Sequence, residues 1–408
     1  MKKRVAVVNS HPIQYFAPLY AYLNASSDIS VTALYLSDCS IRGTKDPGFG
    51  QVVTWDVDLL SGYEARFMKG AATAFPAGFF SLIAPDLWGA IRNGDFDAVL
   101  LHGHHYAANF IAMAAAKSAG IPVLMRCDTH LKLKRKGMKQ ILRKPILSAV
   151  YRACDGFLAI GDANKEFYVA MGVPADKISI VPCAVDNARF MASSSFQDSE
   201  RRALRHSLGI SNERPAILYA SKLQRRKHPD CVVRAAQRLA SEGVAFDLVI
   251  VGAGEMEGEL RKLVAEGGPA NTVFTGFVNQ DRLPKILGAC DVFVLPSEEE
   301  PWGLIVNEAM CAGLPIVVGA DVGCVPNLVR DGENGLLVQP ADTMGLAAAL
   351  RRIVTDPQLA LNMSTRSRQI IGAWGFEQCL DGWRQSLARY ARPRKAAPAA
   401  PGRRSQAS

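Results

Sequence analysis

The stretch SEEEPWGLIVNEAM places acidic side chains on both sides of a Pro-Trp-Gly turn. Gly303 permits close backbone approach, and the apolar run after it predicts a helix that stops at Gly313. The first N–H groups of such a helix, near Gly303, Leu304 and Ile305, form a ready binding site for phosphate. Glu308 lies one turn after Leu304, and its carboxylate leans back toward a ligand at the helix start. Beside a phosphate, the natural partners of that carboxylate are the vicinal hydroxyls of a sugar.

A group of cations lies in the sequence ASKLQRRKHPD, directly after a predicted strand. Breaking a sugar–phosphate bond leaves a nucleoside diphosphate, whose growing negative charge must be met by positive groups already in place. Lys222 and Lys227 are candidates for this role. Because Lys cannot make the bidentate contact of Arg, Arg225 or Arg226 could add to the contact at Lys222. The alternative is that these cations are only solvated on a loop.

Short apolar strands alternate with helical segments along the whole chain, and these elements must position the candidate residues. The predicted strands are 4–9, 31–36, 97–103, 121–126, 156–161 and 178–183 in the first half, and 215–221, 246–254, 272–277, 291–297, 315–320 and 334–340 in the second. This alternation predicts two doubly wound α/β domains with parallel sheets. Ligands of such sheets bind at the carboxyl ends of the strands, so we expect the site in a cleft between the domains.

The spacing of Glu300 and Glu308 around Gly303, followed by EAM-x-x-G-x-P, resembles the signature of the family 4 retaining glycosyltransferases. The motifs VGAGE, VFTGFV, DVFVLPS, GLPIVVG and DGENGLLVQP follow in the family's order. The resemblance implies an α/β chain with the GT-B fold, in which two Rossmann-like domains face each other across a cleft. It also implies transfer of a sugar from a nucleotide-diphosphate sugar to an acceptor hydroxyl with retention of anomeric configuration, in polysaccharide, glycolipid or related glycoconjugate synthesis.

The resemblance assigns roles to individual residues of the second domain. Glu300 would contact the donor sugar near its reacting end, and Glu308 would hold the ribose. Lys227, and Lys222 where relatives commonly carry Arg, would bind the diphosphate. The remaining donor-side candidates are Gly303, Leu304 and Ile305 at the helix start, Gly252 and Gly254 in the nucleotide pocket, and Gly276, Phe277 and Val278 beside the base.

The first domain offers less explicit candidates at the ends of its strands. His11, Gln14 and Tyr15 supply hydrogen-bonding groups for an acceptor or for the sugar, although His11 could serve only to turn the chain. By resemblance, Asp128 stands where many relatives carry a His near the reacting carbon, and this difference leaves its catalytic role open. His104 and His130 are neighbouring acceptor-side candidates.

We place the first domain at residues 1–195, the donor-binding domain at 196–375 and a helix that returns to the first domain at 376–392. The last segment, residues 393–408, is predicted to be a disordered basic tail. About half of the formal net charge of +9 lies near this end, since residues 391–408 carry five basic residues and no acid. A second basic cluster, residues 131–144, predicts either a solvated helix face or peripheral contact with an anionic membrane.

Composition limits the other classes of function. The odd, scattered cysteines, the lack of a long apolar run and the absence of a signal-like N-terminus predict a cytoplasmic protein, with possible peripheral contact at the inner membrane. No aromatic residues interleave the basic clusters, so nucleic acid is not an expected partner; the expected partners are a nucleotide-sugar donor and a glycan or lipid-linked acceptor. No cofactor and no essential metal are expected. Two alternatives stay open: a metal-dependent hydrolase that uses the cluster His102–His105, and a catalytically silent GT-B module.

Overall fold

The strands of the first half form a seven-stranded parallel sheet in the order β5-β2-β1-β6-β7-β8-β9. The computed structural model describes residues 2–26, 28–72, 75–133, 138–269 and 271–392. In β1, Val5 and Val7 belong to the core on one face of the sheet, and Ala6 and Val8 to the core on the other. Both faces are therefore buried, which explains why these strands read as continuous apolar runs. The strands are β1 (Lys3–Asn9), β2 (Ile29–Ser37), β5 (Glu64–Ala72), β6 (Ala98–His102), β7 (Val123–Arg126), β8 (Gly156–Ala159) and β9 (Ile178–Ile180).

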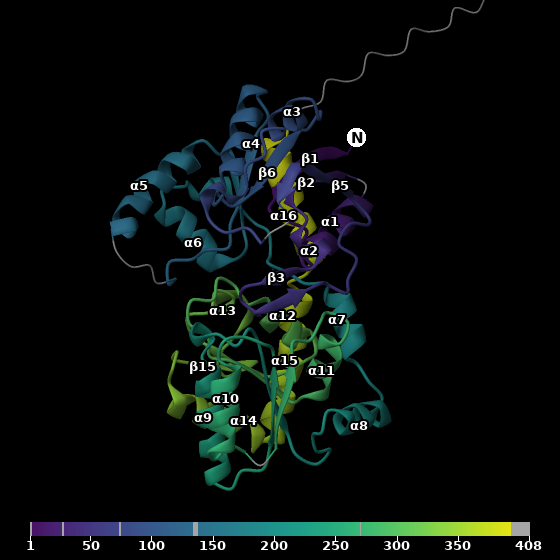
Figure 1. Ribbon diagram of the computed structural model, residues 1–408, viewed down its shortest axis with the longest axis vertical. Helices are drawn as coiled ribbons and strands as arrows, with labels where there is room; N and C mark the ends of the chain where they lie inside the picture. The colour runs from purple at the N-terminus through teal and green to yellow at the C-terminus, as the bar shows by residue number, and fades with distance from the viewer. Residues whose placement is uncertain (1, 27, 73–74, 134–137, 270, 393–408) are drawn as a thin grey trace, which may run out of the picture.

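Helices cover both faces of this first sheet (Figure 1). They are α1 (Phe16–Ala25), α2 (Cys39–Arg42), α3 (Leu87–Arg92), α4 (Ala107–Ser118), α5 (Met138–Arg152) and α6 (Asp162–Ala170), with the 3-10 turns η1 (Phe79–Ser81) and η2 (Ala175–Lys177). None of the helices in the described part of the chain is both long enough and apolar enough to cross a membrane.

A six-stranded parallel sheet forms the second domain, in the order β12-β11-β10-β13-β14-β15. Its strands are β10 (Ala216–Ala220), β11 (Asp247–Val251), β12 (Thr272–Gly276), β13 (Val292–Leu295), β14 (Ile316–Gly319) and β15 (Gly335–Val338). The helices around it are α9 (Pro229–Ser241), α10 (Glu257–Ala265), α11 (Leu283–Ala289), α12 (Leu304–Cys311), α13 (Val325–Leu328), α14 (Thr343–Val354) and α15 (Pro357–Gly372), and the turn η3 (Arg225–Lys227) follows β10. The prediction of two α/β domains with parallel sheets is confirmed.

Two helices, α7 (Asn187–Ser194) and α8 (Asp198–Ser207), lie on the chain between the last strand of the first sheet and the first strand of the second. Helix α7 lies on the chain before residue 195, yet Phe190 is buried in the core of the second domain. Helix α7 therefore packs against the second domain, on α11 and α12. Helix α8 follows and is held by a buried arginine.

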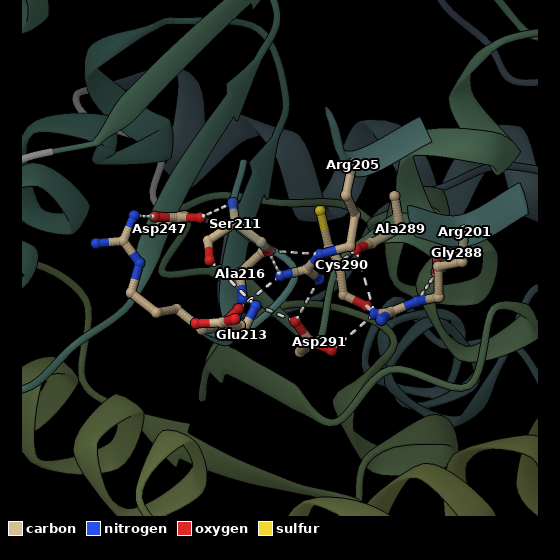
Figure 2. Close-up of polar contacts among 11 residues, drawn as sticks. Arg201, Arg205, Ser211, Glu213, Ala216, Asp247, Gly288, Ala289, Cys290 and Asp291 are labelled. Carbon is tan, nitrogen blue, oxygen red and sulfur yellow. Dashed lines mark hydrogen bonds and ion pairs between the residues drawn. The ribbon is translucent and has the colours of Figure 1, made fainter. Parts of the chain in front are cut away.

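The polar contacts of α8 lie near Ala216 and Asp247, the first residues of β10 and β11 (Figure 2). Arg205 donates hydrogen bonds to the carbonyls of Ser211 and Ala289 and forms an ion pair with Asp291 at 2.9 Å. Arg201 binds the same carboxylate at 2.8 Å. Asp291 also accepts a hydrogen bond from the amide of Ala216, at the start of β10. This cluster joins the interdomain connection to the base of the second sheet.

The last described helix, α16 (Phe376–Tyr390), crosses to the first domain and packs against β8 and β9 (Figure 1). Its side chains Leu380, Trp383 and Leu387 are buried in the core beneath the first sheet. The chain therefore passes between the domains twice, once before α7 and once before α16.

A short antiparallel hairpin, β3 (Thr44–Asp46) and β4 (Gln51–Val53), leaves the first domain after α2. It lies between the two domains (Figure 1). The sequence pattern predicts neither this hairpin nor β5.

Candidate active site in the interdomain cleft

Two adjoining cavities, of about 440 and 380 Å³, lie where the carboxyl ends of both sheets meet. Tyr15, Lys227, Glu300 and Ile305 line both of them. The first cavity, here called the acceptor-side cavity, is also lined by Asp128 of the first domain and by the turn Pro301–Leu304. The second, called the donor-side cavity, is lined by Glu308 and by strand ends of the second domain. The cleft predicted from the two sheets is therefore present.

The turn before α12 has a backbone conformation that calls for glycine. Gly303 has a φ of +91°, in the left-handed region that favours glycine, and it is the residue before the first turn of the helix. Trp302 donates a hydrogen bond from Nε1 to Asn307 at 2.9 Å and stacks on Trp374, with ring centroids 5.7 Å apart. The N–H groups of Leu304 and Ile305 are the first of α12 and have no partner within the helix. Leu304 lines the acceptor-side cavity, and Ile305 lines both cavities.

Lys227 and Glu300 form an ion pair at the junction, with side chains that are 8% and 12% exposed. Burial and the neighbouring Arg226 and Lys222 lower the pKa of Lys227 to about 7. An anionic ligand at this place would compete with Glu300 for Lys227 and would leave the carboxylate available to hydroxyl groups.

The backbone of the Glu300 loop is held from both domains. His130 of the first domain donates from Nε2 to the carbonyl oxygen of Glu300 at 2.9 Å. In the second domain, the backbone carbonyl of Arg226 accepts a hydrogen bond from the amide of Glu298. The guanidinium group of Arg226 donates a hydrogen bond to the carbonyl of Glu299. The predicted acceptor-side residue His130 therefore contacts the loop and does not line either cavity. A relative shift of the domains would move Glu300.

Glu308 is fully buried beneath the donor-side cavity. Burial raises its pKa to about 7, and the neighbouring Tyr15, Arg189 and Gln280 partly offset this rise. Within the described residues neither carboxylate oxygen makes a well-formed hydrogen bond. A buried carboxylate without such bonds is costly, so its presence at a cavity wall indicates a ligand that donates to it.

Lys222 also faces the donor-side cavity, where its ammonium group is paired with a residue of the first domain. Its Nζ lies 2.9 and 3.0 Å from the two carboxylate oxygens of Asp46, at the end of β3. Nζ also lies 4.5 Å from the centre of the Phe49 ring. The two predicted diphosphate cations are thus both paired with carboxylates, Lys227 with Glu300 and Lys222 with Asp46.

The glycine candidates serve different purposes. Gly252 lines the donor-side cavity, and a side chain there would collide with the carbonyl of Ser221. Gly254 approaches the backbone of Leu223 in the same way and does not line the cavity. The carbonyl oxygen of Gly276 accepts a hydrogen bond of 2.9 Å from the amide of Gly252. The next two residues, Phe277 and Val278, form part of the cavity wall.

The first-domain candidates separate into two groups. Asp128 lines the acceptor-side cavity, Tyr15 lines both cavities, and Gln14 lines the donor-side one. His11 lies beside a smaller pocket of about 100 Å³ near β3, and burial lowers its pKa to about 4. His104 stacks on His105, with ring centroids 4.8 Å apart, and does not line the two main cavities.

The histidine run at residues 102–105 does not gather into a metal cluster. His102 is hydrogen-bonded through Nε2 to the hydroxyl of Tyr20 at 3.0 Å, and burial lowers its pKa to about 3. Among the described residues no three His, Cys, Asp or Glu side chains are arranged to hold a metal ion. The hydrolase alternative therefore lacks a metal-binding constellation in this part of the chain.

Several residues of the cavity walls were missed in the sequence analysis. Arg126, the last residue of β7, lines the acceptor-side cavity and donates to the carbonyls of Val181 and Pro182. Its position at a strand end, two residues before Asp128, is a signal that could have identified it. Asp46 carries no such signal, because it reaches the site only through contact between the two domains. Gln280 lies in the loop just after β12 and could have been identified from that position.

Two family models match consecutive parts of the chain. Residues 66–189 match the family described as Glycosyltransferase Family 4. Residues 200–370 match the family described as Glycosyl transferases group 1. Together they cover most of both domains.

The chain is also similar in sequence to individual curated glycosyltransferases. The chain is 30% identical over 209 residues to the uncharacterized glycosyltransferase MJ1607 of Methanocaldococcus jannaschii. This match covers 51% of this chain and 53% of that protein. It is 29% identical over 308 residues to the D-inositol 3-phosphate glycosyltransferase of Streptomyces scabiei, covering 71% of this chain and 67% of that one. The chain thus spans about half to two thirds of the length of these curated relatives.

Solved structures share the fold at low sequence identity. HepE of Anabaena, in complex with UDP and glucose, has a TM-score of 0.72 at 17% identity, over 94% of this chain and 99% of that chain. Sucrose-phosphate synthase of Thermosynechococcus elongatus has a TM-score of 0.68 at 18% identity, over 95% and 100%. With the two sheets and the motifs around the cleft, these matches show that the chain belongs to family 4 of the glycosyltransferases and has the GT-B fold.

Proposed function

We propose that the protein transfers a sugar from a nucleotide-diphosphate sugar to an acceptor hydroxyl, with retention of anomeric configuration. The observation that carries the proposal is the buried Lys227–Glu300 ion pair at the junction of two cavities, next to the start of α12. A diphosphate needs fixed cations and free N–H groups, while a sugar needs carboxylates. This junction offers all three within one wall.

In this proposal the nucleotide occupies the donor-side cavity. The diphosphate lies at the N–H groups of Leu304 and Ile305 and is neutralised by Lys227, with Lys222 as the second cation. Glu308 accepts hydrogen bonds from the ribose hydroxyls, which add to its contacts with Tyr15 and Gln280. The base lies against Phe277 and Val278.

The transferred sugar lies between the cavities, where Glu300 receives its hydroxyl groups once the diphosphate has engaged Lys227. The acceptor hydroxyl enters through the acceptor-side cavity, past Asp128. It attacks the face that the leaving phosphate vacates, and that phosphate takes its proton. The step forms a new glycosidic bond, breaks the sugar–phosphate bond and needs no protein nucleophile. The two lysines and the helix start meet the charge of the leaving group, so no essential metal is expected.

The proposal extends to the class of acceptor: a growing polysaccharide, a glycolipid or a related glycoconjugate. Glycosyltransferases among the similar structures include a lipopolysaccharide galactosyltransferase, which is consistent with such acceptors. The basic cluster 131–144, proposed to contact an anionic membrane, lies partly outside the described residues: positions 134–137 are not described. Within it, Lys132 pairs with Asp321 of the second domain at 3.0 Å.

A thermal-shift panel of UDP-, GDP- and ADP-sugars tests the proposal. A ligand at about 100 times its dissociation constant adds about 2.7 kcal/mol to the stability of the protein. For a domain of this size, such an increase raises the melting temperature by at least about 5 °C. We expect one nucleotide class to give this shift. If no nucleotide sugar and no nucleoside diphosphate shifts the melting temperature, the chain is a silent member of the family and the proposal is wrong.

A further inference from the structure

The hairpin β3–β4 belongs to the first domain but is bound to the nucleotide side of the second. The Asn279 side chain donates to the carbonyl of Thr54 at 2.6 Å, just after β4. The amide of Asp281 donates to the carboxylate of Asp56 at 3.2 Å. Both second-domain residues follow Val278, the last residue of the wall proposed to face the base. Two hydrogen bonds therefore join the segment just after β4 to the segment just after this wall.

Three aromatic rings from the two domains meet at this opening. Phe49 of the hairpin turn contacts Phe277 edge to face, with ring centroids 4.8 Å apart. Trp55, two residues after β4, contacts the same ring at 6.2 Å. All three rings are half-buried and line the donor-side cavity. Aromatic surface that stays partly exposed at a cavity wall suits the flat face of a nucleobase.

The hairpin also controls one of the two phosphate-binding cations. Asp46 binds Lys222 through both carboxylate oxygens, and its side chain is only 13% exposed. The turn amides of Gly48 and Phe49 donate to the same carboxylate at 2.7 and 3.3 Å, which holds it in place. A diphosphate that approaches Lys222 must displace this carboxylate or bind beside it against like-charge repulsion.

We propose that the hairpin is the first domain's half of the nucleotide site. Phe49 and Trp55 contact the nucleobase opposite Phe277, and the diphosphate replaces Asp46 as the partner of Lys222. This inference rests on the proposed function, because it assumes that a nucleotide occupies the donor-side cavity. It adds that base recognition depends on both domains, so that nucleotide binding and the approach of the domains are coupled.

Calorimetric titration of the full chain with UDP, GDP and ADP, and separately with inorganic pyrophosphate, tests the inference. We expect Phe49→Ala and Trp55→Ala each to weaken binding of the preferred nucleoside diphosphate about tenfold and to leave pyrophosphate binding unchanged. Asp46→Asn should strengthen binding of both ligands severalfold, because it removes the competing carboxylate. The matched control is Phe80→Ala, an aromatic residue that is 75% exposed elsewhere on the first domain and should change neither affinity.

The outcomes separate the two proposals. Absence of nucleotide binding in the unaltered protein would contradict the proposed function and the hairpin's role with it. Normal nucleotide affinity in Phe49→Ala and Trp55→Ala would overturn the hairpin's role alone, as would an equal loss of pyrophosphate binding. If the alanine variants do not fold, Trp55→Phe keeps the packing. The fluorescence change on nucleotide binding should then fall by at least half, and an unchanged signal would again overturn the inference.

Discussion

Burial of the Glu308 carboxylate lowers the stability of the folded protein. It is fully buried in α12, and the groups around it only partly offset the effect of burial, which raises its pKa to about 7. A structural role would favour an apolar side chain at this position. The cost is understandable if the carboxylate receives the hydroxyl groups of a bound ribose.

Replacement of Glu308 should therefore change stability in a pH-dependent way. Since the pKa is about 7 in the folded protein and 4.5 otherwise, the folded chain holds this proton more tightly, and its stability contribution is lost as pH rises from 4.5 to 7. Between pH 4.5 and pH 8, Glu308→Gln should gain about 3 kcal/mol in unfolding free energy relative to the unaltered protein. Urea unfolding at both pH values measures this.

An exposed residue provides the comparison for that measurement. Glu266→Gln, at the exposed end of α10, should show no such change with pH. A stability difference between Glu308→Gln and the unaltered protein that stays constant from pH 4.5 to pH 8 would contradict the burial argument. The variant should also lose nucleotide affinity, although it folds more stably at pH 8.

At the scale of elements, the sequence predicts those strands and helices whose signals lie in neighbouring residues. The strand at Val5–Val8 is apolar on both faces because helices cover both, so its type follows from composition alone. Helix α12 was predicted because Gly303 and Gly313 mark its ends. The hairpin β3–β4 was missed, because strands of three residues have no periodicity. Its contact between Asp46 and Lys222 joins residues 176 positions apart.

The anchoring of α8 gives a prediction about an element far from the cleft. Arg205 is 2% exposed and its guanidinium group satisfies several carbonyls and Asp291 (Figure 2). Arg205→Ala would leave these buried acceptors without a donor and should lower the unfolding free energy by about 3 kcal/mol. Urea unfolding followed by circular dichroism measures the loss.

The control for this arginine is a surface ion pair of the same domain. Arg366 pairs with Glu333 at 3.0 Å, and both side chains are about half exposed. Arg366→Ala should change the unfolding free energy by less than about 0.5 kcal/mol. Equal effects of the two substitutions would show that the α8 contacts do not stabilise the second domain.

At the scale of the whole molecule, both domains contribute residues to the site. The Lys227–Glu300 pair and Glu308 belong to the second domain, while His130 holds the Glu300 loop and Asp46 holds Lys222 from the first. Helix α16 packs into the core of the first domain, so the chain after the second domain is anchored on the first. Sequence patterns predict the two domains and most residues of the donor wall, but Asp46 joins the site only when the domains are placed together.

The central claim is that the Lys227–Glu300 pair catalyses transfer from a nucleotide sugar, and release of the nucleoside diphosphate tests it most directly. With excess protein and the donor found in the thermal-shift panel, Glu300→Gln and Lys227→Ala should each lower the single-turnover rate at least about 100-fold while staying folded. Glu299→Gln, the neighbouring acid, should release product at close to the unaltered rate. Release at that rate by Glu300→Gln or by Lys227→Ala would contradict the assignment of the site.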